Sequence, residues 1–207
     1  MEYLLIFFNF SLLIPLLIGL YKIKELNKQF SVLIIYLFAS LFNELYSIIP
    51  HSDIGLKISY LISFVIESQC FLYIFYIWSI NRTPKLILFQ ILFLILSFFD
   101  ILIMLNSDLK SIELMHLIQT LFLLILSTKA LIVRRFRNES VMLLIAIPFI
   151  IHSIYFIILN LLMWFLYSQS TKSLFINLYS IIPLINFLSY ISYSLAFIWA
   201  PKKEKYL

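Results

Sequence analysis

Long apolar runs, separated by short polar segments, occupy almost the whole of this chain. A helix needs about 20 residues to cross the ~30 Å hydrocarbon core of a bilayer, and each run is close to that length or longer. The runs predict seven transmembrane helices, over residues 3–21, 30–49, 56–80, 86–105, 113–133, 140–166 and 174–200. We therefore predict an all-α polytopic membrane protein with one seven-helix domain, residues 1–200, and a short basic cytoplasmic tail, residues 201–207.

The composition agrees with this pattern. The chain is 63% hydrophobic and 12% charged, and its mean hydropathy is +1.05. A soluble domain of this length could not bury so much apolar surface. The first run has no basic residue before it and no small-residue cleavage site, so we expect a permanent helix with a kink at Pro15 rather than a secretory signal. The single cysteine, Cys70, excludes a disulfide within the chain.

Basic residues are concentrated in alternate connections, and this asymmetry sets the predicted orientation. One side carries Lys57, Lys110 and Lys172. The other side carries Lys22, Lys24, Lys28, Arg82, Lys85, Arg134, Arg135, Arg137, Lys202, Lys203 and Lys205. By the positive-inside rule the second side is cytoplasmic, so the N-terminus is outside and the C-terminus is in the cytoplasm. The abundance of Ile, Phe, Asn, Lys and Tyr favours an AT-rich genome, and we expect a bacterial cytoplasmic (inner) membrane.

Two short similarities suggest an internal repeat. Residues 31–33 (Ser-Val-Leu) and 140–142 (Ser-Val-Met) each open a predicted helix after a basic segment. At the same offset, Tyr46 aligns with Tyr155. This pattern fits two parallel three-helix units joined by the fourth helix, a 3+1+3 arrangement. In so biased a composition, chance similarity explains the match equally well.

Polar residues inside the apolar runs recur at spacings of three and four, which places them on one face of each helix. A charged side chain at the bilayer centre costs about 2.5–3.5 kcal/mol, so such residues need internal partners or a function. The candidate ligand-binding residues are Glu44, Glu67, Asp100, His116, His152, Asn186 and Tyr190. Glu44, Asp100 and His116 are expected in the outer part of the membrane and Glu67 and Asn186 near its middle, so the polar residues as a whole are weighted toward the outer half. This predicts a polar cavity near the outer surface, above an apolar and aromatic floor.

Structural roles compete with this interpretation. Glu44 and Glu67 could be protonated and hydrogen-bonded to tyrosine and serine neighbours, and Asp100 lies near enough to a helix end to reach interfacial water. His152 is the best-placed switchable base, although a buried histidine is often simply hydrogen-bonded. The asparagine and tyrosine of the last helix could tie helices together.

Several motifs of enzymes and carriers are absent from the sequence. There is no His-Glu-x-x-His, no Gly-x-Ser-x-Gly and no pair of histidines at ligand spacing on one helix. The two glycines, Gly19 and Gly55, do not interrupt a helix at mid-membrane, as carriers often do. We therefore predict no catalytic residue, metal ligand or cofactor, and we regard an enzyme as the less favoured class.

The leading hypothesis is a receptor-like sensor. Its outward-facing acidic pocket would take a small polar or cationic ligand or a proton, and binding would shift helices around Pro148 and Pro183. The expected partners are the lipid bilayer, that ligand and a signalling protein supplied in trans, and no nucleic acid is expected. The alternative is a proton- or cation-coupled transporter with Glu44 and Glu67 as coupling carboxylates. A membrane hydrolase is the third hypothesis.

Overall fold

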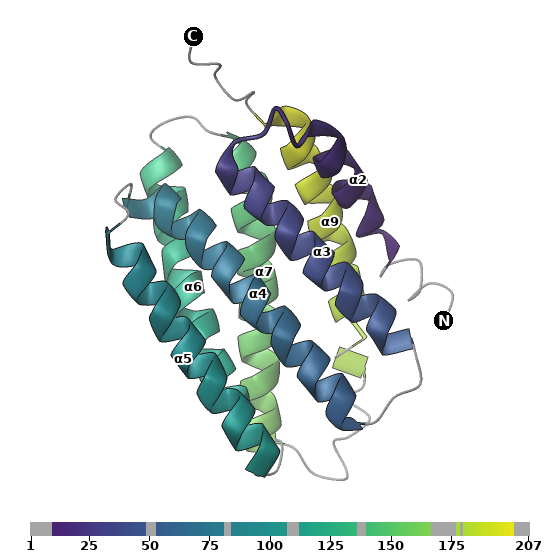
Figure 1. Cartoon of the computed structure of the whole chain (residues 1–207), viewed down its shortest axis with the longest axis vertical. Coiled ribbons are helices and arrows are strands. Elements are labelled where there is room, and N and C mark those ends of the chain that lie inside the picture. Colours follow the sequence, from purple (N-terminus) through teal and green to yellow (C-terminus); the bar gives the residue numbers. More distant parts are fainter. Residues whose placement is uncertain are drawn as a thin grey trace.

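The chain folds into a bundle of α-helices (Figure 1). The computed structural model describes residues 10–48, 53–80, 84–106, 112–135, 140–166, 177–178 and 180–200. Its helices are α2 (Leu13–Lys22), α3 (Lys28–Ile48), α4 (Asp53–Ile80), α5 (Pro84–Asn106), α6 (Ile112–Arg135), α7 (Ser140–Leu166) and α9 (Ile182–Trp199). The prediction of an all-α fold is confirmed.

Four of these helices are long and apolar enough to cross a membrane. The spans are Lys28–Tyr46, Leu61–Trp78, Ser140–Leu162 and Ile182–Trp199, with mean hydropathy between 1.3 and 2.5. The apolar stretches in the described parts of α2, α5 and α6 are shorter. Exposed isoleucine, leucine or phenylalanine side chains lie on all seven helices. A surface this rich in apolar side chains is typical of a protein surrounded by lipid.

Six helices form a closed ring. Going round it, α2 contacts α3, α3 contacts α4, α4 contacts α6, α6 contacts α7, α7 contacts α9, and α9 returns to α2. Helix α5 stands outside the ring and packs on α4 and α6 (Figure 1). Consecutive helices run in opposite directions, so α2 and α9 end where α3 begins. We call this the lysine end, after Lys22, Lys24 and Lys28, and we call the end where α3 stops and α4 begins the opposite end.

Prolines lie in the first turns of α2 and α9. Residue 10 is helical, the chain turns at residues 11–12 and α2 begins at Leu13, so Pro15 lies just after an interruption of the helical run; the predicted start at residue 3 lies outside the described residues. The last helix is not continuous from residue 174, because a turn at residues 180–181 precedes α9, with Pro183 in its first turn. Proline lacks an N–H group, and the first helical turn is where that loss costs least.

An aromatic cluster fills the ring on the lysine-end side of its middle. Phe71 and Phe75 of α4 are 1% and 0% exposed, and their ring centroids are 5.6 Å apart. Both contact Phe149 of α7, at centroid distances of 4.4 and 4.9 Å. Tyr36 of α3 packs on Phe71 at 4.9 Å and on Tyr193 of α9 at 6.3 Å. Side chains of α3, α4, α7 and α9 thus meet in one cluster, which we call the aromatic core.

Helix α2 is fastened to the end of α9. The Lys22 ammonium group donates to the carbonyl oxygens of Phe197 at 3.2 Å and Ile198 at 2.7 Å. These carbonyls lie in the last turn of α9, where no backbone N–H remains to satisfy them. The positive charge also faces the negative end of the helix dipole.

Helix α5 is held to the ring by polar and aromatic contacts. Gln119 of α6, which is 0% exposed, donates to the Ser97 hydroxyl at 3.2 Å and to the Phe93 carbonyl at 3.4 Å. The Phe122 ring of α6 packs on Phe93 and Phe89 of α5, at centroid distances of 5.5 and 5.1 Å. These contacts fix α6 between α5 and the interior of the ring.

A hydroxyl group of α9 repairs a break in the backbone pairing of α7. Pro148 lies inside α7 and has no N–H, so the Leu144 carbonyl lacks its usual helical donor. Ser192 of α9 donates its hydroxyl to that carbonyl at 2.6 Å. Side chains of neighbouring helices commonly satisfy a carbonyl that proline frees in a membrane. This hydrogen bond joins α7 to α9 beside the proline. We call this part of α7, residues 144–148, the Pro148 hinge.

We expect Ser192→Ala to lower the free energy of unfolding by about 1 kcal/mol, because the Leu144 carbonyl loses its donor. Ser189→Ala is the matched control. The Ser189 hydroxyl donates to the Ile185 carbonyl of its own helix, so removing it leaves the pairing between helices unchanged. Thermal unfolding of both variants in detergent measures the difference, and equal losses would contradict the role given to Ser192.

Candidate functional site

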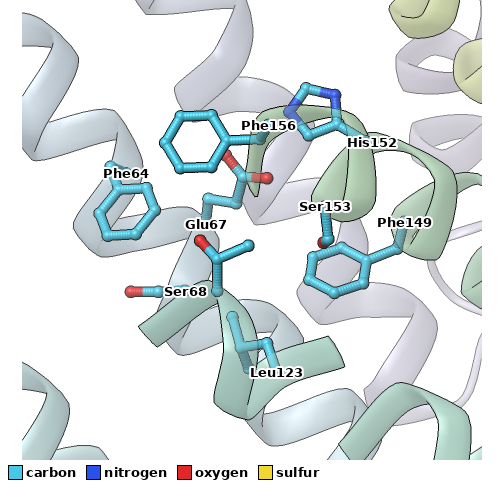
Figure 2. A pocket seen from close by; sticks show the side chains of 9 residues that line it. Phe64, Glu67, Ser68, Leu123, Phe149, His152, Ser153 and Phe156 are labelled. Atoms are coloured by element: carbon cyan, nitrogen blue, oxygen red, sulfur yellow. The ribbon is translucent and has the colours of Figure 1, made fainter. Parts of the chain in front are cut away.

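A small cavity lies inside the ring, between α4, α6 and α7 (Figure 2). Its volume is about 40 Å³. The lining residues are Phe64, Glu67, Ser68, Thr120, Leu123, Phe149, His152, Ser153 and Phe156. An ordered water needs about 10–15 Å³ of such space, so the cavity has room for two or three waters. It therefore suits water, a proton carried by water or a small cation, whereas sites for drug-sized ligands measure about 300–1,000 Å³.

Two titratable side chains from different helices share this cavity. Glu67 comes from the middle of α4 and His152 comes from α7, one turn after Pro148. Figure 2 shows the Glu67 carboxyl group on the side of the pocket where Phe156 and His152 stand. Both groups can take up and release a proton, and imidazole does so near neutral pH in its unperturbed state. The pocket thus combines proton-exchanging groups with three hydroxyl groups, those of Ser68, Thr120 and Ser153.

Helical geometry explains why these residues meet. Positions 64, 67 and 68 of α4 fall within about one turn, and positions 149, 152, 153 and 156 of α7 fall within about two turns. Residues three and four apart lie on the same face of a helix, so each helix presents one polar patch between phenylalanines. Phe64 of α4 and Phe149 and Phe156 of α7 flank these patches in the cavity wall.

Helix α9 reaches the site through Asn186. The Asn186 side chain is within hydrogen-bonding reach of the His152 imidazole. A hydrogen bond to one ring nitrogen determines which nitrogen carries the proton and orients the ring. Asn186 therefore links the state of His152 to the position of α9.

Three tyrosines of α3 and α9 lie within electrostatic range of Glu67. Tyr190 and Tyr193 of α9 are 4% and 3% exposed, and Tyr36 of α3 packs on Tyr193. All three interact electrostatically with Glu67. Tyr190 also interacts with Glu44 of α3. One phenol group thus lies within electrostatic range of both glutamates.

Glu44 lies nearer to the opposite end than Glu67 does. It is partly exposed and comes four residues before the last residue of α3, Ile48. Beside it, Asn43 accepts a hydrogen bond at Oδ1 from the Ser59 hydroxyl of α4, at 3.0 Å. This bond holds α3 against α4 close to Glu44.

The structure separates the predicted site residues by position. Glu67 and His152 line the cavity, Asn186 adjoins His152, and Tyr190 lies within electrostatic range of both glutamates. His116 does not line the cavity. Its ring contacts the ring of Phe64, a lining residue, with centroids 3.7 Å apart. His116 therefore packs against the cavity wall without lining the cavity. The side chain of Asp100 lies outside the described part of the structure.

Two residues that line the cavity were not predicted from the spacing of polar residues. Ser68 and Ser153 directly follow Glu67 and His152 in the sequence, and a search at spacings of three and four passes over such neighbours. A helix beside a cavity presents an arc of at least about 100°, wide enough for consecutive residues. The signal was present as two matching pairs, Glu-Ser and His-Ser.

Within the described residues there is no group of three or more His, Cys, Asp or Glu side chains placed to hold a metal ion. The single cysteine of the sequence, Cys70, is buried on α4 one turn after Glu67.

Comparisons of the chain with protein-family models, curated proteins and solved structures found no match. The function must therefore be argued from the residues of the site.

Proposed function

We propose that this chain is a receptor-like membrane sensor, and that its ligand acts at the cavity shared by Glu67 and His152. The ligand class is a proton or a small polar or cationic species. The observation that carries the proposal is that a carboxyl group and an imidazole, from α4 and α7, line one cavity of about 40 Å³. Charge taken up in so small and weakly polar a space interacts strongly with both groups, and so acts on two helices at once.

The aromatic core supports a sensor rather than a channel through the bundle. Phe71 and Phe75 follow Glu67 on α4 at intervals of one turn and are almost fully buried. Phe149 both lines the cavity and packs on these two rings. The polar site thus has a closely packed apolar layer on its lysine-end side.

The Pro148 hinge could transmit a structural change from the cavity to the lysine end of α7. His152 lies one turn from Pro148, and the part of α7 before the proline is held to α9 by the Ser192 hydrogen bond. A ligand moves a two-state protein only if it binds one state better than the other. A change of charge at His152 or Glu67 would favour one arrangement of this hinge. A signalling protein in trans would bind at the Ser140 end of α7 and respond to that arrangement.

The finer topology belongs to the same proposal. We place all seven helices across a bacterial inner membrane, with the N-terminus outside and the lysine end in the cytoplasm. The cavity then opens toward, or lies beneath, the outer face. The ring supports a 3+1+3 plan, since α2, α3 and α4 form one half, α6, α7 and α9 form the other, and α5 stands outside.

Labelled protein tests the sensor function. Spin labels at introduced cysteines, Leu143→Cys on α7 and Ile132→Cys on α6, report hinge movement in a Cys70→Ser background, since Leu143 and Ile132 are 42% and 59% exposed. We expect the label separation to change by about 1–2 Å or more between acid and alkaline pH, or on adding sodium or potassium. Glu67→Gln should abolish the change without loss of folded protein.

The control is Glu25→Gln, which alters an exposed carboxyl group in the turn after α2. It should respond as the unsubstituted protein does. A wild-type separation that ignores both pH and cations would contradict the sensor proposal, as would a Glu67→Gln protein that responds normally.

A proton- or cation-coupled transporter is the second candidate. The observation that favours it is the ring itself, in which two sets of three helices enclose the polar site, as repeated halves do in carriers. Solute-driven proton or sodium flux in proteoliposomes, lost in Glu67→Gln, would favour the transporter over the sensor.

A further inference from the structure

Most of the buried hydroxyl groups in the described part of this bundle take part in hydrogen bonds. The Ser59 hydroxyl donates to Asn43 of α3. Most of the others donate to a carbonyl oxygen of their own helix, three or four residues back, as hydroxyl groups in membrane helices often do. The hydroxyls with such a partner belong to Ser68, Ser97, Ser127, Ser189 and Ser194.

Thr120 of α6 and Ser153 of α7 are exceptions. They are 7% and 1% exposed, and neither hydroxyl group has a hydrogen-bond partner among the residues that the structure describes. Both residues line the cavity. Since a buried polar group seldom lacks a partner, such exceptions commonly mark the position of a bound water or ion.

Glu67 supplies a third oxygen-bearing group to the same cavity. Within the described residues its carboxyl group makes no hydrogen bond or ion pair, either with His152 or with another side chain. A carboxylate inside an apolar bundle needs a positive charge beside it. No described lysine or arginine side chain lines the cavity. The balancing charge must therefore come from a proton or from a cation bound in the cavity.

We propose that the cavity binds a small monovalent cation of the sodium type, held by the Glu67 carboxylate and the hydroxyl oxygens of Thr120 and Ser153. The three groups come from α4, α6 and α7, and Figure 2 shows Glu67 and Ser153 at the pocket. Beside the ion, the volume of about 40 Å³ leaves room for one or two waters that complete its coordination. This inference rests on the proposed function and names the ligand of its site.

The donor set fits a monovalent ion better than a divalent one. Carboxylate, hydroxyl and water oxygens are the ligands that hard cations take. Ca²⁺ takes about 6–8 oxygen ligands, and either Ca²⁺ or Mg²⁺ would keep an uncompensated positive charge beside a single carboxylate. A sodium ion leaves the cavity neutral when Glu67 is ionised and His152 is not. One ion would then join α4, α6 and α7, and through Ser153 it would act close to the Pro148 hinge.

Protons compete with the ion, because a metal ligand must be deprotonated to bind. Among the described titratable groups, Glu67 and His152 are the ones that line the cavity, and an imidazolium at His152 would repel a cation. The other described titratable groups on the neighbouring helices and on α4 itself are Tyr36 and Glu44 of α3, Cys70 of α4, Tyr190 and Tyr193 of α9, His116 behind Phe64 on α6, and the exposed Lys129 and Lys85 of α6 and α5. Sodium binding should therefore weaken at acid pH.

Equilibrium binding of radioactive sodium to the purified protein tests the site. At alkaline pH, with choline chloride keeping the ionic strength constant, we expect saturable binding of a single ion per chain. Glu67→Gln should abolish this binding. Thr120→Val and Ser153→Ala should each raise the dissociation constant by at least about fivefold, because each removes one oxygen ligand.

Two controls change hydroxyl groups that already have partners. Thr128→Val repeats the threonine change on α6, where the exposed Thr128 hydroxyl donates to the Leu124 carbonyl at 2.8 Å. Ser127→Ala matches Ser153→Ala in depth, since Ser127 is 0% exposed and its hydroxyl also donates to Leu124. Both variants should bind sodium within about twofold of the unsubstituted protein. Circular dichroism without sodium shows which variants are folded.

The unsubstituted protein decides the matter even if a variant fails to fold. A protein that shows no saturable sodium binding would overturn the cation site and leave a proton as the balancing charge. Equal weakening in Thr120→Val and Thr128→Val would overturn the coordination. Spin labels that respond to pH in a protein that binds no sodium would leave the sensor function intact. Sodium bound by a protein whose labels never respond would instead overturn the sensor function and leave the site.

Discussion

Phe75→Ala is expected to lower the free energy of unfolding by about 2–3 kcal/mol. Phe75 is 0% exposed and contacts Phe71, Trp78 and Phe149, with centroid distances of 5.6, 6.1 and 4.9 Å. In a bilayer the usual gain from moving an apolar side chain out of water is small, because lipid is as apolar as phenylalanine. What remains is the cavity, roughly 100 Å³ at about 24 cal/mol per Å³.

The matched control is Phe38→Ala on the outer face of α3. Phe38 is 48% exposed, so lipid can fill the space that its ring leaves, and we expect a change within about 0.5 kcal/mol. Unfolding in detergent, followed by circular dichroism, compares the two variants. If Phe38→Ala costs as much as Phe75→Ala, the aromatic core does not hold the ring of helices together.

The bounds of most helices could be predicted from the hydrophobic runs. In lipid the backbone N–H and C=O groups must pair with one another, so an apolar run of this length forms a helix. Helix α7 has the predicted bounds, residues 140–166, and α4 ends at the predicted residue 80. The prediction was wrong where local chemistry cuts into an apolar run. The start of α9 at Ile182 follows from Pro183 and not from hydropathy, because the sequence is apolar both before and after residue 182.

Which helices meet could not be read from the sequence. Apolar faces are alike on every helix, so hydropathy does not reveal that α5 stands outside the ring or that α9 closes it against α2. The same limit applies to the site. Regular spacing indicated Glu67 and His152, but only the packing of α4 on α6 and of α6 on α7 shows that they share a cavity while His116 stays behind Phe64.

The two glycines had been interpreted only as evidence against broken helices. One of them has a packing role that depends on residues far away in the chain. A Cβ atom at Gly19 of α2 would lie 3.0 Å from Ile34 Cγ1 of α3 and 3.1 Å from the Phe197 ring of α9. Small residues let helix backbones approach closely in membranes, where packing drives association.

Gly19→Leu is expected to lower the free energy of unfolding by about 3 kcal/mol, the upper part of the usual range for overpacking, and to detach α2 from the ring. The reason is that both neighbours are nearly immobile: Ile34 is 3% exposed and Phe197 is 0% exposed. Gly19→Ala should cost less than half as much, because alanine adds one methyl group and gains up to about 1 kcal/mol in helix propensity. Thermal unfolding in detergent measures both.

The double variant Gly19→Ala with Phe197→Leu tests the cause. Shortening the ring at Phe197 removes two of the three nearest atoms, so the Gly19→Ala change should cost less in this background than alone, with a coupling of about 0.5 kcal/mol or more. Leu17→Ala, on the exposed face of the same helix, serves as the control and should couple to neither. Strictly additive losses would mean that close approach at Gly19 is not what joins α2 to α3 and α9. The lysine end of the ring would then depend on Lys22 and its hydrogen bonds to the carbonyls of α9.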